Sequence, residues 1–404
     1  MTSIPRYSKY ARYFAILAAS VLSIMLFDWV RMDLPESLET DWTAFDRAAD
    51  RLLAGEEVYR PFSFESEPLP YFYPPFALWL ALPLGALGFW GSYIYSAALT
   101  LIAYIAGLRW FGRSAPGEID RTTGIILAVA SGATIGSTLI GQYSGVWVLS
   151  LGGACLLFTR DRKFLAGLVL ALLWLKPNIA IAVPVVLVWS RSWQPLKGFA
   201  LGSGALGLAS LPLGLSQWSG FISNARNIAE LQEQGLVPLD KMVTVLAGIQ
   251  TTFGIEDQAA LSLIIWLPIA AVTGVSVLTL WSKGRLAEDP VRAFGALALF
   301  VVAANPRLYF YDATLAAFGM FGLWMSVQAS GSESAKRRIT ILALIVWFGL
   351  WGSIWLSFNL IVGPAVAVSL VATAISSRQK ATSENVITGQ FGDQKAAKSG
   401  DFAA

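Results

Sequence analysis

The sequence predicts an all-α, polytopic membrane protein, and four observations support that prediction. Hydrophobic residues make up 55% of the 404 residues and charged residues only 14%. In a soluble domain, about a quarter of all residues are charged. Mean hydropathy is +0.59. Apolar segments of membrane-spanning size recur along nearly the whole chain. Lys and Arg cluster between these segments, as expected where basic residues orient membrane helices.

The first apolar segment, residues 13–30, reads as a retained membrane anchor. It follows three basic residues, as a signal peptide would, but it ends in the bulky sequence Phe-Asp-Trp. Signal peptidase needs small residues at the end of the apolar region. We therefore expect the segment to stay in the protein and to form its first crossing.

The basic clusters set the predicted topology. Placing seven of them in the cytoplasm puts 21 of the 29 basic residues inside, and leaves the loop 31–73 outside with ten acids and four bases. The clusters are Arg6/Lys9/Arg12, Arg109/Arg113/Arg121, Arg160/Arg162/Lys163, Arg191/Lys197, Lys283/Arg285/Arg292, Lys336/Arg337/Arg338 and the tail from Arg378.

Between residue 73 outside and Arg109 inside, an odd number of crossings is required, yet two apolar stretches occur there, 73–90 and 93–108. The first contains three prolines, which disfavour a regular helix. We predict that it is an interfacial or re-entrant element and that the second stretch crosses.

About twelve crossings result, with both termini in the cytoplasm and a second outer loop at 216–257. The remaining spans are 122–140, 146–159, 164–175, 179–190, 198–213, 259–281, 291–304, 311–328, 339–357 and 360–375. Several are shorter than the roughly 20 residues that a full crossing needs. The membrane domain would cover residues 1–375, and the polar tail 376–404 is too poor in apolar residues to fold.

A short amphipathic helix is predicted in the outer loop 31–73. Thr40 or Asp41 can cap its N-terminus and Gly55 can end it. One face is apolar, and comprises Trp42, Phe45, Ala49, Leu52 and Leu53. We expect this face to rest on the membrane. Asp50 lies off the face and Asp46 at its border, and both are interpreted as surface charge.

The chain has no histidine and one cysteine, Cys155. It therefore lacks the commonest general base and metal ligand, and a disulfide framework. Proton transfer must fall to Asp, Glu, Lys or Tyr.

Under this topology, the unusual polar clusters all face outward and would line one pocket. They are Asp41, residues 71–76, residues 141–145, residues 176–178 and residues 305–312.

Two cations in the pocket are candidate phosphate ligands. Lys176 lies between two apolar stretches, where an ammonium costs roughly 2.5–3.5 kcal/mol; the alternative is a lysine that reaches to lipid headgroups. Arg307 is the best bidentate phosphate ligand of the outer half, and the alternative is a structural ion pair with Asp312.

Three further residues have open interpretations. Gln142 follows a glycine and can approach a ligand closely, or can simply belong to a hairpin turn. Tyr73 can line the pocket or anchor the chain at the interface. Asp41 can be a helix cap, a catalytic base, or both.

Taken together, these motifs resemble glycosyltransferase family 87. The similar features are Asp41-x-x-x-Phe45 through Ala49, Gly55 and Tyr59, Tyr73-Pro74-Pro75-Phe76, Gly141-Gln142, Ala166-Gly167 leading to Lys176-Pro177, and Tyr311-Asp312. The resemblance implies a GT-C membrane enzyme that takes a sugar from a polyprenyl-phosphate donor with inversion, and it implies Asp41 as the general base. Some members carry histidine where this chain has residues 305–312. Arg307, Tyr311 or Asp312 would then substitute in handling the acceptor, with Asn178 beside them in the pocket.

This reading implies a lipid-linked sugar donor, a glycan or glycolipid acceptor and surrounding membrane lipids as partners, with no nucleic acid. The chain has no Asp-x-Asp pair for a sugar-nucleotide metal site, so we expect no metal and no cofactor. The enzyme would lie in the cell's inner membrane with its site facing outward, and mannose or arabinofuranose are the expected sugars. A transporter or flippase of lipid-linked sugars is the main alternative, and a non-catalytic assembly factor is the second.

Overall fold

The structure is a computed structural model that describes residues 41–60, 70–115, 120–233, 239–255, 258–355 and 361–377, with residues 13, 16, 20 and 24. Most of the predicted first span and the whole tail from residue 378 lie outside the described residues. Within these ranges the chain forms helices and no β-sheet, although an antiparallel bridge pairs Met242 with Tyr309. The predicted all-α class is therefore confirmed for the described chain.

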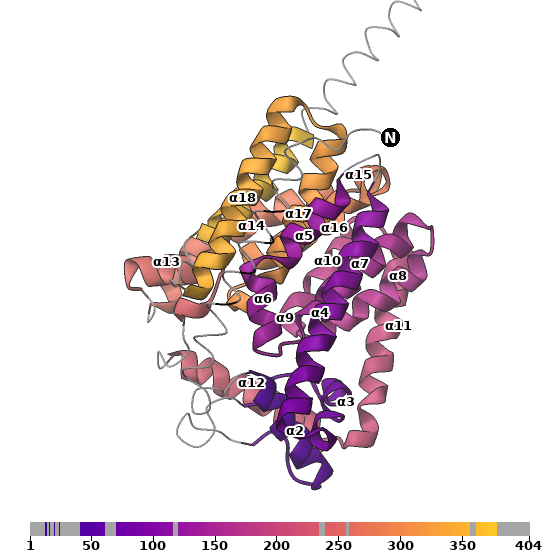
Figure 1. Cartoon of the computed structure of the whole chain (residues 1–404), viewed down its shortest axis with the longest axis vertical. Coiled ribbons are helices and arrows are strands. Elements are labelled where there is room, and N and C mark those ends of the chain that lie inside the picture. Colours follow the sequence, from indigo (N-terminus) through magenta and orange to yellow (C-terminus); the bar gives the residue numbers. More distant parts are fainter. Residues whose placement is uncertain are drawn as a thin grey trace, which may run out of the picture.

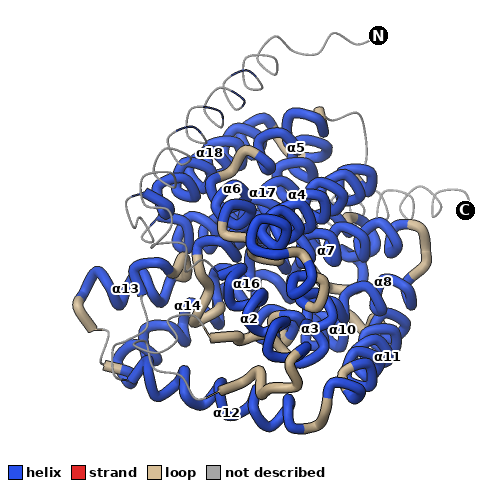
Figure 2. Tube along the Cα trace, turned by 60° about the horizontal axis from the view of Figure 1, so that its bottom comes forward, coloured by secondary structure: helices blue, strands red, loops and turns tan. Residues whose placement is uncertain are grey.

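The helices form a bundle that tapers toward one end (Figure 1). In chain order they are α2 (Asp41–Leu53), η1 (Pro75–Ala77), α3 (Leu78–Ala81), η2 (Leu84–Ala86), α4 (Gly88–Ser114), α5 (Arg121–Val129), α6 (Gly132–Leu139), α7 (Ser144–Thr159), α8 (Lys163–Leu170), η3 (Ala171–Leu175), α9 (Pro177–Ala180), α10 (Ala182–Trp189), α11 (Trp193–Ala209), η4 (Leu211–Leu213), α12 (Ser216–Glu233), η5 (Leu239–Lys241), α13 (Val245–Phe253), α14 (Ala259–Leu280), α15 (Lys283–Glu288), α16 (Pro290–Ala304), η6 (Phe310–Ala313), α17 (Thr314–Ser330), α18 (Glu333–Trp355) and a last helix Ile361–Ser377. Seen toward the tapered end, α2 and α3 lie over the bundle and α12 runs along its rim (Figure 2).

Three described helices are long and apolar enough to cross a membrane: Gly88–Ser114, Trp193–Leu213 and Ala260–Leu280. A fourth is obtained if α5 and α6, which meet at a bend of 49°, count as one span. The other apolar helices are shorter, so the twelve crossings stay a prediction. The proline-rich stretch 73–90 breaks into η1, α3 and η2, as its composition predicts.

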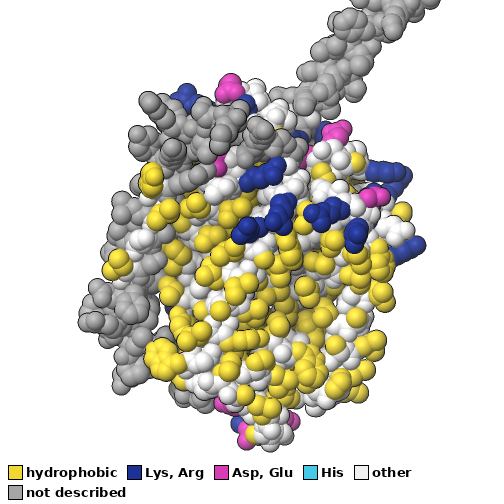
Figure 3. All heavy atoms as spheres, turned by 45° about the vertical axis from the view of Figure 1, so that its right-hand side comes forward, with side chains coloured by type: hydrophobic (Ala, Val, Ile, Leu, Met, Phe, Trp, Pro, Cys, Tyr) yellow, Lys and Arg dark blue, Asp and Glu magenta, His cyan; other side chains and the backbone are white. Residues whose placement is uncertain are grey.

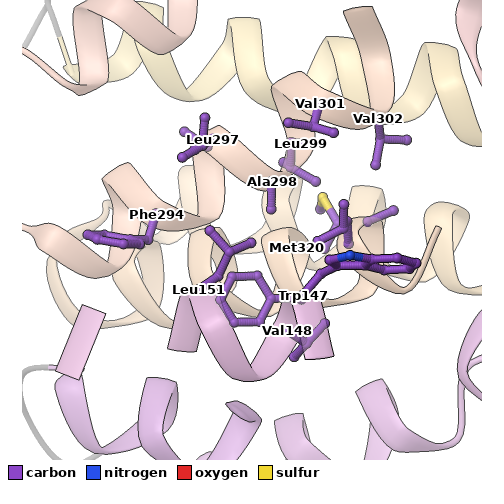
Figure 4. Packing of buried hydrophobic residues seen from close by; sticks show 14 of the residues in the cluster. Trp147, Val148, Leu151, Phe294, Leu297, Ala298, Leu299, Val301, Val302 and Met320 are labelled. Carbon is purple, nitrogen blue, oxygen red and sulfur yellow. The ribbon is translucent and has the colours of Figure 1, made fainter. Parts of the chain in front are cut away.

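The centre of the bundle is built on α7, which carries apolar residues on every face because other helices cover it on all sides. Trp147 and Leu151 of α7 face Phe294 and Ala298 of α16, and Met320 of α17 closes the layer (Figure 4). All five side chains are at most 3% exposed.

Glycines let α4 and α7 approach to backbone contact. A Cβ atom placed on Gly145 or Gly152 would strike the carbonyl oxygen of Thr100 or Gly107, and one on Gly107 would strike that of Val148. We call these three glycines the α4–α7 glycine seam. Only glycine permits this separation, so the seam fixes the distance between the two helices.

The surface has the polarity of a membrane protein. On the face shown in Figure 3, hydrophobic side chains form a broad band, and Lys and Arg side chains gather along one edge of that band. Exposed basic residues occur at the α7–α8 turn, with Arg160 and Arg162, and at the α10–α11 turn, with Arg191. The helices α2 and α12 lie at the opposite end of the bundle (Figure 1).

The predicted helix of the loop 31–73 is present as α2, but the prediction that its apolar face rests on the membrane is wrong. Trp42, Phe45 and Ala49 are at most 1% exposed, because α3, η2 and α4 cover them. The backbone N–H of Trp42 donates to the carbonyl of Ile140 (3.1 Å), which attaches the start of α2 to the α6–α7 turn. The helix is thus docked on protein, and of its predicted apolar face Leu53 is 60% exposed.

Candidate functional site

The α6–α7 turn presents Gln142 to the site. Gly141 adopts φ +67°, a left-handed conformation that glycine reaches at no steric cost, and this turns the chain between the two helices. The hydroxyl of Thr100 donates to the main-chain carbonyl of Gln142. The side-chain oxygen of Gln142 accepts a 2.5 Å hydrogen bond from the hydroxyl of Tyr73. The predicted pair of Tyr73 and Gln142 is therefore in direct contact.

Tyr73 also joins this turn to α2. Its carbonyl accepts a hydrogen bond from the hydroxyl of Tyr59 (2.6 Å), and its ring lies 4.7 Å from that of Phe45. Because Trp42 is bonded to Ile140, the first residue of α2, Asp41, has its backbone beside the turn that carries Gln142. The side chain of Asp41 lies outside the described part of the structure.

Lys176 forms a buried ion pair with Asp312, which lies 136 residues further along the chain. The lysine side chain is 19% exposed and the aspartate side chain 0%. The ammonium also lies over the rings of Trp147 (5.4 Å) and Tyr311 (5.0 Å), a favourable arrangement for a cation. The amine is therefore turned toward protein and not toward lipid headgroups, and the expected alternative pair of Arg307 with Asp312 does not form.

Asp312 is held by the turn that contains it, η6. Its Oδ2 atom, which binds Lys176, also accepts a bond from the backbone N–H of Tyr309 (3.3 Å) and so caps η6. Its Oδ1 atom is buried and has no hydrogen-bond partner among the described residues. Burying a carboxylate is costly unless a charge compensates it, so Lys176 and Asp312 depend on each other.

Arg307 lies in the loop between α16 and η6, half-buried beside α9. Its backbone groups are bonded to the side chains of Asn305 and Asn178. Its guanidinium has no hydrogen bond or ion pair within the described chain. Burial lowers the pKa of Arg307, but arginine starts so high that it stays charged at neutral pH. The loop thus holds an uncompensated cation.

The two groups of residues share a wall. Gln142 closely precedes α7, and Trp147, which covers Lys176, lies in the first turns of the same helix. Leu175, the neighbour of Lys176, packs in one cluster with Phe45 and Tyr143. Seven of the eight predicted site residues are placed by the structure in these two adjoining groups: Tyr73, Gln142, Lys176, Asn178, Arg307, Tyr311 and Asp312.

The sequence of this chain matches a known protein family. The model of glycosyltransferase family 87 matches residues 71–304, more than half of the chain. The chain belongs to glycosyltransferase family 87. It is therefore a membrane glycosyltransferase, as the resemblance of the motifs indicates. No curated protein matches the chain. Tyr73, Gln142, Lys176 and Asn178 lie within the segment that matches family 87, whereas Asp41 and residues 305–312 lie outside it.

The candidate site contains residues that the sequence analysis did not single out. Trp147 lines the Lys176 ammonium, Thr100 fixes Gln142, and Asn305 fixes Arg307. Trp147 and Thr100 sit inside apolar helices where nothing in the sequence marks them. Asn305 opens the cluster 305–312, and its position before a proline, where the helix must end, was a usable signal.

Asp46 is less exposed than the sequence analysis predicts, where it is interpreted as surface charge. It is half-buried on α2, and this burial raises its pKa. Asp50, by contrast, is exposed as predicted. Across the described chain of this family 87 protein, no group of three or more His, Cys, Asp or Glu residues is placed to bind a metal ion.

Proposed function

We propose that this glycosyltransferase moves a sugar, mannose or arabinofuranose, from a polyprenyl-phosphate donor to an acceptor hydroxyl on the outer face of the inner membrane. The observation that supports it is the side chain of Arg307, a half-buried residue whose guanidinium lacks a partner within the described chain. Arg307 lies in the loop that leads into η6, where Asp312 pairs with Lys176. An unpaired buried cation is costly, and a phosphate is the anion whose geometry a guanidinium matches best.

The two cations have different roles in this proposal. Arg307 binds the donor phosphate directly, with two parallel N–H donors. Lys176 is committed to Asp312 and is enclosed by aromatic rings, so it adds positive potential from a fixed position. Tyr73 and Gln142, already bonded to each other, line the side of the site nearest α2.

The reaction is a single displacement at the anomeric carbon. Asp41 takes the proton of the acceptor hydroxyl, the acceptor oxygen forms its bond to the anomeric carbon from the side opposite the phosphate, and the bond between that carbon and the phosphate oxygen breaks. Polyprenyl phosphate leaves with the bonding electrons and the sugar is inverted. A phosphate leaving group needs cationic stabilisation rather than protonation, which suits a site with Arg307 and no histidine.

Two features support Asp41 as the base. It opens α2, whose start is bonded to the turn that carries Gln142. A carboxylate next to a bilayer also loses hydration, and this raises its pKa toward the working pH of a general base.

The test is transfer of labelled sugar from synthetic polyprenyl-phosphate donors, screened across sugars with the purified protein in nanodiscs. We expect a labelled glycan or glycolipid with one sugar donor only. The flippase alternative predicts a different result, namely movement of labelled donor between the leaflets of a vesicle with no new glycosidic bond. Absence of product with every donor would contradict the proposed function.

A further inference from the structure

We propose that Asn178 and Asn305 are positioning residues that clamp Arg307 for a lipid phosphate, an inference that rests on the proposed function. Each asparagine holds one main-chain group of Arg307. The Oδ1 atom of Asn305 accepts a 3.0 Å bond from the Arg307 N–H, and the Nδ2 group of Asn178 donates a 3.0 Å bond to the Arg307 carbonyl.

The two asparagines are also bonded to each other. Asn305 donates its Nδ2 group to the main-chain carbonyl of Asn178 (3.1 Å), and the Nδ2 group of Asn178 lies 3.4 Å from Asn305 Oδ1. Asn305 is only 6% exposed, so this bonding takes place largely away from solvent. The clamp therefore joins α9 to the loop that follows α16, two segments more than a hundred residues apart.

The loop needs such a clamp because it has no helix or sheet to hold it. Asn305 is extended, with φ −68° and ψ 130°, and ends α16. On the far side of Arg307, the carbonyl of Leu308 accepts a 2.9 Å bond from the N–H of Val243. The backbone around Arg307 is thus fixed on both sides, while its guanidinium remains without a partner in the described chain.

This division suits anion binding. Bidentate binding by arginine requires the planar group in one orientation, and a preorganised binding group loses less freedom when the ligand arrives. Asn178 and Asn305 fix the main chain from which the Arg307 side chain extends, and so reduce the freedom that the guanidinium must lose; Arg307 supplies the charge. The clamp thus gives a definite role to Asn178, which the sequence analysis places in the pocket beside the residues that handle the acceptor.

The test is a double-mutant cycle on binding of farnesyl phosphate, a short polyprenyl phosphate that carries no sugar. Asn178 is exposed, so Asn178→Ala should fold normally. It removes one hydrogen bond to Arg307, and we expect Kd to rise about three- to ten-fold. Arg307→Gln should weaken binding by roughly ten- to a hundred-fold. Because Asn178 acts through Arg307, adding Asn178→Ala to Arg307→Gln should change Kd by less than about two-fold.

A second cycle uses Asn305→Leu in place of Asn178→Ala, and the same pattern is expected. Gln250→Leu is the matched control for Asn305→Leu. Gln250 is buried and donates a 2.9 Å amide bond to Ser262, away from Arg307, so its loss should leave Kd unchanged. An equal loss from Asn178→Ala with and without Arg307 would show that Asn178 touches the ligand itself, and would overturn the clamp. An unchanged Kd in both asparagine variants, or no binding by the unaltered protein, would also overturn it. Because this readout needs no catalysis, failure of the transfer assay alone would remove the proposed reaction and leave the clamp standing.

Discussion

At the scale of single residues, the site contains one paired cation, Lys176, and one cation without a partner in the described chain, Arg307. The Lys176–Asp312 pair is enclosed, with the carboxylate wholly buried. Such pairs contribute little net stability, but removing one partner leaves an uncompensated charge behind. Stability and chemistry are therefore linked at this point, and the next two predictions separate them.

Lys176→Met should destabilise the protein by roughly 3 kcal/mol, the low end of the range for a broken buried pair because the lysine is 19% exposed. Adding Asp312→Asn removes the stranded charge, so the double variant should recover most of that loss. Unfolding in detergent measures both. The double variant should still bind donor less well than the unaltered protein, because the Lys176 ammonium is gone while Arg307 remains. A double variant no more stable than Lys176→Met would show that the pair is not the origin of the effect.

Asp41→Asn tests the general base. Asparagine caps a helix about as well as aspartate, so α2 should form and the protein should insert normally. We expect kcat to fall roughly 10²- to 10⁴-fold, the usual contribution of general-base catalysis. Asp50→Asn is the control, since Asp50 is exposed on the same helix. A normal rate for Asp41→Asn, or an equal loss in both variants, would exclude Asp41 as the base.

At the scale of elements, the docking of α2 on the α6–α7 turn brings the first residue of α2, Asp41, beside the turn that carries Gln142. Hydrophobic periodicity predicts that α2 has an apolar face, but it says nothing about what covers that face. Protein covers it, because the broken stretch of η1, α3 and η2 folds back under the helix. The sequence likewise predicts that Lys176 and Asp312 belong to one outer pocket, yet their pairing across 136 residues depends on the packing of α9 against the loop that leads into η6, which no local pattern encodes.

Gly141→Ala tests the docking. A Cβ atom at Gly141 would lie 2.6 Å from Trp42 Cβ and 3.2 Å from Ser96 Cβ, so α2 must shift away from the turn. Gly55→Ala is a matched control, because Gly55 has a similar φ of +72° but no atom within 4 Å of its added Cβ. Both variants should lose about 1–2 kcal/mol of stability from the left-handed conformation.

Only Gly141→Ala should also lose transfer activity, since only it displaces the start of α2. Sugar transfer measured beside unfolding in detergent makes the comparison. Equal activity in the two alanine variants would show that the position of α2 does not matter for catalysis.

At the scale of the whole molecule, charge separates the two ends of the bundle. Lys and Arg gather along one edge of the apolar band, and α2 lies at the opposite end (Figures 1 and 3). Basic residues stay in the cytoplasm, so α2 and the site should face outward. The expected orientation can be predicted from the sequence alone, because membrane insertion depends on the hydrophobicity of the segments and on the positions of the basic residues between them. The number of crossings does not follow as simply, since most apolar helices of the described chain are shorter than a full span.

Single-cysteine labelling tests the orientation. Cys155 is buried and should not react with a thiol reagent. We expect Glu57→Cys, on the exposed segment after α2, to react with an impermeant maleimide in intact cells. Arg162→Cys, at the exposed α7–α8 turn, should react only after the membrane is permeabilised. The reverse pattern would place the site in the cytoplasm.

The α4–α7 glycine seam has a consequence for how substrates reach the site. Where two backbones touch, no side chain can rotate to open a path, and separating the helices would break the contact along its whole length. The wall formed by Gln142 and Trp147 therefore stays in place through the catalytic cycle. The loop that carries Arg307 is held differently, by two amide side chains and by backbone hydrogen bonds. Any motion that admits a substrate must therefore come from segments other than α4 and α7.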